Sequence, residues 1–159
     1  VAGLREFSLR CVEAFAGHVA GPVRNRGEVL PRLAQGGLDD AMIAVGSFSR
    51  GSNGHFPGDF RYAILGEVSR RVARVRQFGS TGVDLAYTAS GALGGAVVFG
   101  HHAWDNAAGA ALVLAAGGRV TDLAGAVDDE RGGDERPAGG VERGEESLGD
   151  VHVSVLSPG

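Results

Sequence analysis

Lysine is absent from this sequence of 159 residues, in which all fifteen basic residues are arginine. The chain therefore cannot use the lysine of a nucleotide-binding P-loop, a Schiff-base lysine or a Ser-Lys dyad. Cysteine occurs once, as Cys11, which excludes an internal disulfide and a cysteine-ligated zinc cluster. Because a lone cysteine is typical of a reducing compartment, we expect a cytoplasmic protein.

Long hydrophobic runs are also missing. The longest one, residues 107–118, is well short of the roughly 20 residues that a membrane span needs. No basic segment followed by an apolar one opens the sequence, so we expect neither an export signal nor a membrane partner. The net charge of -4 and the pI of about 5.7 argue against a nucleic acid as partner.

Glycine and acidic residues are abundant. The 28 glycines do not follow a collagen-like period and indicate many tight turns. Residues 126–150 hold nine acidic residues against three arginines, with almost no large apolar side chain. Such a segment cannot bury enough apolar surface to offset its loss of conformational entropy. We predict an acidic, glycine-rich mobile loop over residues 126–150.

The spacing of apolar residues predicts alternating strands and helices. Apolar residues three and four apart predict a helix that runs from Leu4 through Phe15 to Val19. The continuous apolar run 41–45 predicts a buried strand. Asp59 is expected to cap a helix with four residues on its buried side, namely Phe60, Ile64, Val68 and Val72.

The pattern continues to the end of the sequence. Strands are predicted at 75–78, 92–99, 120–123 and 152–155. One helix is predicted through Val83, Leu85, Ala86 and Ala89, and another at 106–116. Ser80 or Thr81 would cap the first helix and Asp105 the second, which Gly117-Gly118 would end. This alternation predicts an α/β fold, a layered sheet with helices on both faces. We expect a divergent segment at 1–40, the folded domain at 41–125 and a last strand within 151–159.

Two of the predicted strand-to-helix junctions could bind a ligand. They are Gly79-Ser80-Thr81-Gly82 and Trp104-Asp105-Asn106-Ala107-Ala108-Gly109. Backbone N–H groups at a helix start favour anions, and such junctions gather at the carboxyl ends of strands in open α/β sheets. An aspartate at a helix start could instead ligate a hard cation such as Mg²⁺. The alternative is that Ser80 and Asp105 act only as helix caps.

Several short motifs follow one another in order along the chain. They are Gly79-Ser80, the run from Asp84 to Gly91, Trp104-Asp105-x-Ala107-Ala108-Gly109, Ala116-Gly117-Gly118 with Asp122, and Gly125. This order resembles the carboxyl-terminal half of the inositol monophosphatase family, in which W-D-x-A-A-G is followed by E-A-G-G. The resemblance runs from about Ala41 to Gly125, so 41–125 would be a phosphatase-like carboxyl-terminal domain.

The resemblance implies a Mg²⁺-dependent phosphomonoesterase that acts on an inositol or sugar phosphate. It implies that Asp105 ligates the metal and lies close to the substrate, and that Gly79, Ser80 and Thr81 contact the substrate. The implied partner is a small-molecule phosphate ester. A homodimer is also implied, because family members often form one.

The sequence departs from the family pattern at most of the other metal ligands. The family's D-P-x-D-G-T motif does not occur, and Gly144-Glu145-Glu146 matches its acidic segment only in a position after the W-D motif. The substrate-binding glutamate of the family falls at Val98, and the glutamate of E-A-G-G at Ala115. A single aspartate cannot assemble a two- or three-metal site, so we expect an incomplete chain with weak or no activity alone.

A non-catalytic remnant or interaction domain that keeps the scaffold is the alternative function. A nucleotide-binding α/β module is a third hypothesis, which no motif supports. His101 and His102 precede the W-D motif and could suggest a metal site, but no third ligand has suitable spacing, and two loop histidines are the simpler interpretation.

Overall fold

The main sheet has five strands, and its first strand in the sequence is parallel to both of its neighbours. The computed structural model describes residues 15–16, 21–34, 36–51, 56–99, 103–121 and 153–155. The strands are β4 (Met42–Val45), β5 (Arg74–Arg76), β6 (Gly95–Val97), β7 (Arg119–Thr121) and β8 (Val153–Val155), in the order β5-β4-β6-β8-β7. Strand β4 is parallel to β5 and β6, whereas β8 is antiparallel to β6 and β7.

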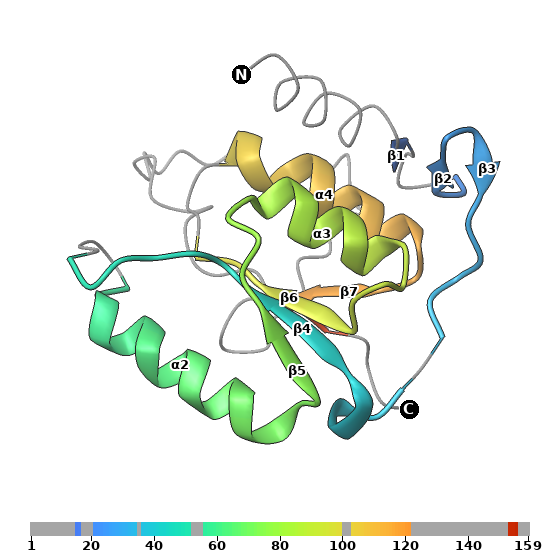
Figure 1. Cartoon of the computed structure of the whole chain (residues 1–159). Coiled ribbons are helices and arrows are strands. Elements are labelled where there is room, and N and C mark those ends of the chain that lie inside the picture. The colour runs from blue at the N-terminus through green and yellow to red at the C-terminus, as the bar shows by residue number, and fades with distance from the viewer. Residues whose placement is uncertain are drawn as a thin grey trace, which may run out of the picture.

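Helices cover both faces of this sheet, which confirms the predicted fold class (Figure 1). Helix α2 (Gly58–Arg71) lies on one face, and α3 (Thr81–Ala89) and α4 (Ala103–Ala115) lie side by side on the other. The short run 41–45 can serve both faces because successive residues of a strand point in opposite directions. Ala44 belongs to the cluster under α3 and α4, while Val45 packs with the side chains of α2.

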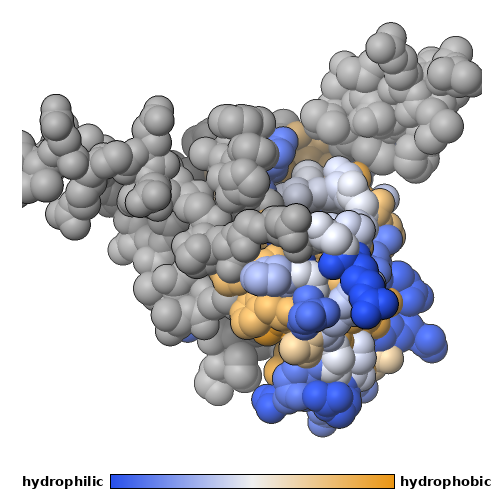
Figure 2. All heavy atoms as spheres, turned by 90° about the vertical axis from the view of Figure 1, so that its left-hand side faces the viewer, coloured by the Kyte–Doolittle hydropathy of each residue, from blue (hydrophilic) through white to orange (hydrophobic). Residues whose placement is uncertain are grey.

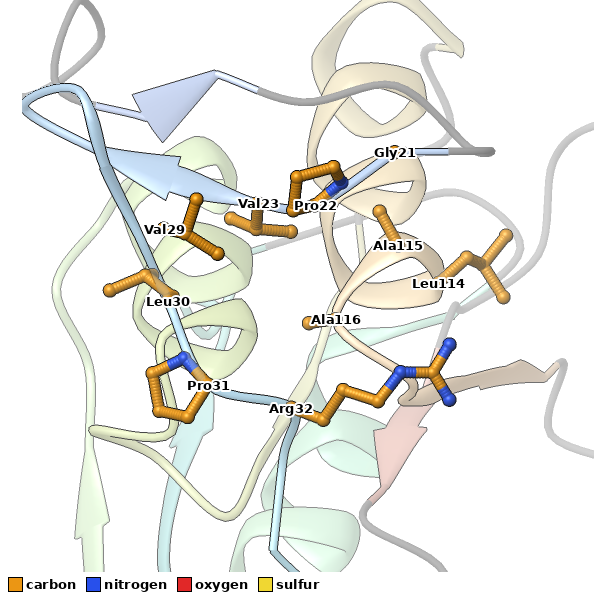
Figure 3. Close-up of a pocket in the computed structure, with 10 residues that line it drawn as sticks. All are labelled: Gly21, Pro22, Val23, Val29, Leu30, Pro31, Arg32, Leu114, Ala115 and Ala116. Carbon is orange, nitrogen blue, oxygen red and sulfur yellow. The ribbon is translucent and has the colours of Figure 1, made fainter.

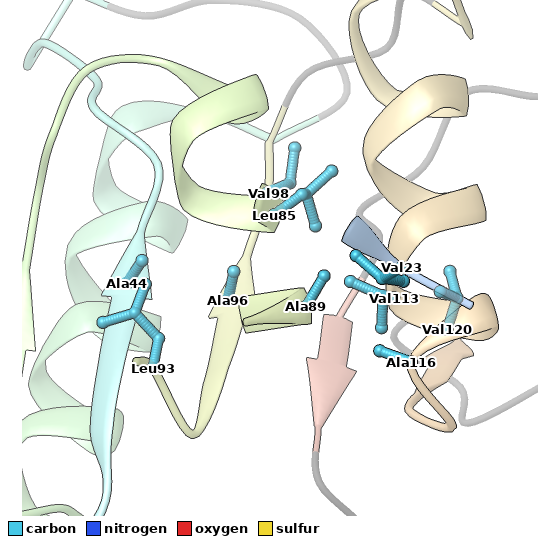
Figure 4. Packing of buried hydrophobic residues seen from close by; sticks show 10 residues of the cluster. All are labelled: Val23, Ala44, Leu85, Ala89, Leu93, Ala96, Val98, Val113, Ala116 and Val120. Carbon is cyan, nitrogen blue, oxygen red and sulfur yellow. The ribbon is translucent and has the colours of Figure 1, made fainter. Parts of the chain in front are cut away.

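The larger hydrophobic cluster lies between the sheet and the pair α3 and α4 (Figure 4). Leu85 of α3 and Val113 of α4 are almost fully buried there, at 0% and 1% exposure. Strands β4 and β6 contribute the small side chains Ala44 and Ala96 to the same cluster. Small residues on the strands allow both helices to lie close to the sheet.

Gly109 explains why α3 and α4 can touch. A Cβ atom built on Gly109 would lie 2.5 Å from Cδ1 and 2.6 Å from Cβ of Leu85. Real side chains essentially never come this close, so any larger residue at 109 would separate the two helices. The final glycine of the W-D-x-A-A-G motif is therefore a packing residue, and it fixes the distance between the helix that carries Asp105 and the helix that follows Gly79.

The carboxyl end of α4 is closed by two glycines, as the sequence predicts. Gly117 has a φ of 90°, its N–H donates to the Leu114 carbonyl at 3.0 Å, and the Gly118 N–H donates to the Val113 carbonyl at 2.9 Å. These two bonds form a Schellman motif, which satisfies carbonyl groups that the helix itself leaves free. The chain then turns directly into β7.

The amino-terminal part contradicts one prediction. Phe15 lies in β1 (Phe15–Ala16), which pairs antiparallel with β2 (Arg24–Asn25), and β2 pairs with β3 (Glu28–Val29). A helix through Phe15 is therefore wrong, and the rest of that predicted helix lies outside the described residues. Arg26 and Gly27 both have a positive φ between β2 and β3, as the tight turn of a two-residue hairpin requires. A 3-10 helix spans Leu38–Asp40.

Two predicted helix caps are wrong. Helix α2 is capped by Pro57, so Asp59 lies inside its first turn, where a negative charge still favours the helix start. Helix α4 begins at Ala103, so Asp105 is also a first-turn residue. Phe60, predicted on the buried side of α2, is 39% exposed, whereas Ile64 and Val68 do pack against the core. Among the described helices, none has the length and hydropathy that crossing a membrane demands.

Candidate functional site

The connections of the sheet bring the starts of three helices to one edge. The chain runs β4, α2, β5, α3, β6, α4, and the three strands are parallel, so every helix begins where a strand ends. Figure 1 shows these helix starts on the same side of the molecule. The connection after β4 leads to one face of the sheet and the connection after β6 to the other. In open α/β sheets, ligands bind at such a switch between adjacent strands.

Gly79, Ser80 and Thr81 form the turn between β5 and α3. Gly79 has a φ of 81°, a left-handed conformation that disfavours other residues. Ser80 occupies the N-cap position, as predicted, although its side chain makes no capping hydrogen bond. Gly79 and Ser80 are exposed, and Thr81 is half-buried. The turn therefore presents backbone and hydroxyl groups to solvent at the carboxyl edge of the sheet.

Ser47 lies beside this turn. A Cβ atom built on Gly79 would be 3.6 Å from the Ser47 Oγ. Ser47 follows β4 and is exposed. Ser47 belongs to the pattern Ser47-x-Ser49-x-Gly51, which lacks the first glycine of a G-x-S-x-G nucleophile elbow. Its closeness to Gly79 depends on the pairing of β4 with β5. The Ser47 hydroxyl and the backbone of the β5–α3 turn therefore lie next to each other at this edge.

Asp105 lies in the first turn of α4, and its side chain is exposed. Helices α3 and α4 lie on one face of the sheet and begin at the same edge (Figure 1). The first turn of α4, which holds Asp105, and the Gly79–Thr81 turn before α3 are therefore on the same side of the sheet. The described residues contain no group of three His, Cys, Asp or Glu side chains able to hold a metal ion. Asp105 could supply one ligand, and the described residues alone do not form a Mg²⁺ site. His101, His102 and Glu145-Glu146 lie outside the described residues.

Asp84 is a buried acid that the sequence did not single out. It lies in α3, is 1% exposed, and neither carboxylate oxygen has a hydrogen-bond partner. Burial raises the pKa of Asp84 from 3.8 to about 6, because the ionised form loses its hydration inside the protein. The neutral form therefore fits this position better. Asp84 is the fourth residue of α3. It directly precedes Leu85, which packs in the hydrophobic cluster between the sheet, α3 and α4.

Aromatic side chains gather at the same edge, around the start of α2. The Phe48 ring makes edge-to-face contacts with Tyr62 at 4.9 Å and with Phe99 at 5.5 Å between ring centroids. Phe56 stacks on Phe60 at 5.3 Å. Figure 2 views the molecule from this side and shows hydrophobic surface next to strongly hydrophilic surface. Phe60 and Tyr62 are exposed by 39% and 48%, so part of the group reaches solvent.

A pocket of about 650 Å³ lies elsewhere, between the β2–β3 hairpin and the carboxyl end of α4 (Figure 3). Its lining includes Val23, Leu30 and Arg32 on one side and Leu114 and Ala116 on the other. None of the residues predicted to contact substrate or metal lines it. Since α4 has thirteen residues, its two ends are about 20 Å apart, and the pocket is separate from Asp105.

Comparison with known proteins matches this arrangement to one family. The model of the inositol monophosphatase family matches residues 14–150, which includes residues 14–40, where we recognised no motif. The inositol-1-monophosphatase ImpA of Mycolicibacterium smegmatis is 52% identical over 114 residues, which are 72% of this chain and 41% of that protein. The probable inositol 1-monophosphatase ImpA of Mycobacterium tuberculosis is 53% identical over 105 residues, 66% of this chain and 39% of that protein.

The solved structures agree with the sequence comparison. The extragenic suppressor protein suhB from Bartonella henselae superposes with a TM-score of 0.65 and 28% identity, covering 89% of this chain and 46% of that one. The chain spans about two fifths of the length of the curated relatives it matches. The family match covers most of the chain, and the fold, the motif order and the helix starts at one edge agree with it. The chain belongs to the inositol monophosphatase family.

Proposed function

We propose that this chain contributes part of the active site of a Mg²⁺-dependent phosphomonoesterase that acts on an inositol or sugar phosphate. The observation that carries the proposal is the common edge of the sheet, where Asp105 and the Gly79–Thr81 turn are both accessible to solvent. Membership of the family and relatives named inositol-1-monophosphatase support the reaction class.

The residues of the edge have distinct proposed roles. Asp105 would supply one carboxylate ligand to Mg²⁺, since hard cations prefer oxygen ligands. The backbone N–H groups at the start of α3, together with the side chains of Ser80 and Thr81, would contact the substrate. Phosphoryl transfer depends mainly on positioning and on neutralising charge, so one carboxylate is not sufficient. We therefore propose weak or no activity for this chain alone.

The remaining proposals concern the binding partners of the chain and its location in the cell. The substrate would be a small-molecule phosphate ester, without nucleic acid or membrane as partner, and the chain would form a homodimer. The single cysteine of the whole sequence supports a cytoplasmic location. A non-catalytic interaction domain is the second candidate, and it is favoured by the lack of a group of three metal-ligating side chains among the described residues.

Phosphate release from inositol 1-phosphate tests the proposal. The purified chain is assayed with and without Mg²⁺, beside Asp105→Asn and the control Asp59→Asn, which changes an exposed first-turn aspartate of α2. We expect slow, Mg²⁺-dependent release that Asp105→Asn abolishes and Asp59→Asn leaves unchanged. No release and no Mg²⁺ binding by the wild type would favour the interaction domain.

A further inference from the structure

The pocket beside the carboxyl end of α4 is formed by two segments that lie far apart in the sequence. One wall consists of residues 21–23 and 29–32, and the other of residues 114–116. Its volume of about 650 Å³ is within the range that small-molecule sites usually have, about 300–1,000 Å³. The pocket therefore has the size of a site for a small molecule, at the end of α4 opposite to Asp105.

Backbone hydrogen bonds and buried side chains hold the two walls together. The Leu33 N–H donates to the Ala116 carbonyl at 3.0 Å, and the Leu30 N–H donates to the Val23 carbonyl at 2.8 Å. Val23 is 2% exposed and packs with Ala116 in the larger hydrophobic cluster. The walls are thus anchored to the core of the domain, and a ligand would bind to them without first having to order the chain.

The side chains that line the pocket are apolar, apart from one arginine. Val29 and Pro31 border it on one side, and Leu114 and the guanidinium of Arg32 on the other (Figure 3). Val29 is 54% exposed, so apolar surface remains at the pocket for a ligand to cover. Burying such surface is favourable in proportion to its area. The lining therefore fits a molecule that is mostly apolar.

Arg32 is the only charged residue among those that line the pocket. It is exposed, and among the described residues neither an ion pair nor a hydrogen bond involves its guanidinium. Its Cδ and Nη1 both lie 3.9 Å from a Cβ built on Gly117, so its side chain lies at the carboxyl end of α4. A planar guanidinium can bind a carboxylate through two parallel hydrogen bonds.

We propose that this pocket binds a small aliphatic carboxylate. The aliphatic chain packs against Val29, Pro31 and Leu114, and the carboxylate pairs with Arg32. Charge complementarity selects this class, because a neutral molecule leaves the guanidinium without a partner and a cation is repelled by it. The proposal does not rest on the proposed function, since no residue assigned to Mg²⁺ or to the phosphate ester lines the pocket.

The competing explanation is that Arg32 serves only α4. A positive charge near the carboxyl end of a helix is attracted by the helix dipole, and this would stabilise the fold without any ligand. Both explanations predict a lower melting temperature when the charge is removed. They differ in the binding of a carboxylate, which only the proposed site makes dependent on Arg32.

Titration of the whole chain with octanoate tests the proposal, followed by calorimetry and by the backbone amide signals in NMR spectra. Octan-1-ol is the neutral probe with an aliphatic chain of the same length. Arg32→Met removes the charge and keeps an apolar side chain, while Ala115→Leu fills space inside the pocket. The matched control is Arg70→Met, which changes an exposed arginine of α2 on the opposite face of the sheet. Circular dichroism checks that each variant is folded.

We expect octanoate to shift the amide signals of residues 23–30 and 114–117 in the wild type. Arg32→Met should weaken octanoate binding about tenfold, as the loss of a hydrogen bond to a charged group does, and leave octan-1-ol binding unchanged. Ala115→Leu should abolish the binding of both probes, and Arg70→Met should bind like the wild type. Octanoate binding by Arg32→Met as tight as that of the wild type would overturn the proposal. No binding by the folded wild type, or shifts confined to other residues, would overturn it as well.

Discussion

Replacing Gly109 by alanine tests how α3 and α4 are held together. The new Cβ would lie 2.5 Å from Leu85 Cδ1 and 2.6 Å from Leu85 Cβ, and the Leu85 Cβ is fixed to the α3 backbone. A rotamer change of Leu85 could move Cδ1 but not its Cβ. Removing the overlap between the new Cβ and Leu85 therefore requires the two helices to move apart. This movement would open the buried cluster around Leu85 and Val113.

The expected loss of stability is the difference between two effects. Overpacking a well-packed core costs about 1–3 kcal/mol. Alanine favours a helix over glycine by about 1 kcal/mol, which offsets part of that cost. We expect Gly109→Ala to lower the free energy of unfolding by up to about 2 kcal/mol, and the melting temperature by up to about 5 °C for a chain of this size.

Urea denaturation followed by circular dichroism measures this difference. The matched control is Gly82→Ala, which changes a glycine of α3 whose built Cβ has no atom within 4 Å. Gly82→Ala should raise the free energy of unfolding by about 0.5–1 kcal/mol, because it gains helix propensity without a clash. A Gly109→Ala variant as stable as Gly82→Ala would refute the packing argument.

Three further predictions concern Asp84, Leu85 and Gly79. The pKa of Asp84 is raised from 3.8 to about 6, so the folded state binds the proton more tightly and loses stability as pH rises between these values. Relative to Asp84→Asn, the wild type should therefore lose about 2 kcal/mol between pH 4 and pH 7.5 in urea titrations; parallel profiles would contradict this. Leu85→Ala should lower the free energy of unfolding by about 2–5 kcal/mol through a cavity, and a loss under about 1 kcal/mol would show that the helices close over it. Gly79→Ala should cost about 1 kcal/mol because φ is 81°, and a calorimetric scan equal to the wild type would count against a strained turn.

The main elements were predictable where a local pattern decides the structure. The run 41–45 is apolar at every position, as a strand buried on both faces requires, and β4 lies there. The glycines at 117–118 end α4 through local hydrogen bonds. The start of α4 was missed because an aspartate favours the N-cap and the first turn alike, so Asp105 does not locate the boundary.

Other features depend on contacts between distant segments, which the sequence pattern does not contain. The strand at Phe15 exists through its pairing with Arg24–Asn25, although the spacing of apolar residues is helical. Asp84 follows a helix start, where acids are usually exposed, and its burial results from packing of α3 against the rest of the domain. The closeness of Ser47 to Gly79 likewise follows from the pairing of β4 with β5.

Isothermal titration of Mg²⁺ into the chain tests the role of Asp105 most directly, because it needs no substrate and no turnover. The proposed site predicts heat of binding for the wild type and for Asp59→Asn, and none for Asp105→Asn. Equal binding by wild type and Asp105→Asn would contradict Asp105 as a metal ligand, and no binding by the wild type would contradict a Mg²⁺ site in this chain alone.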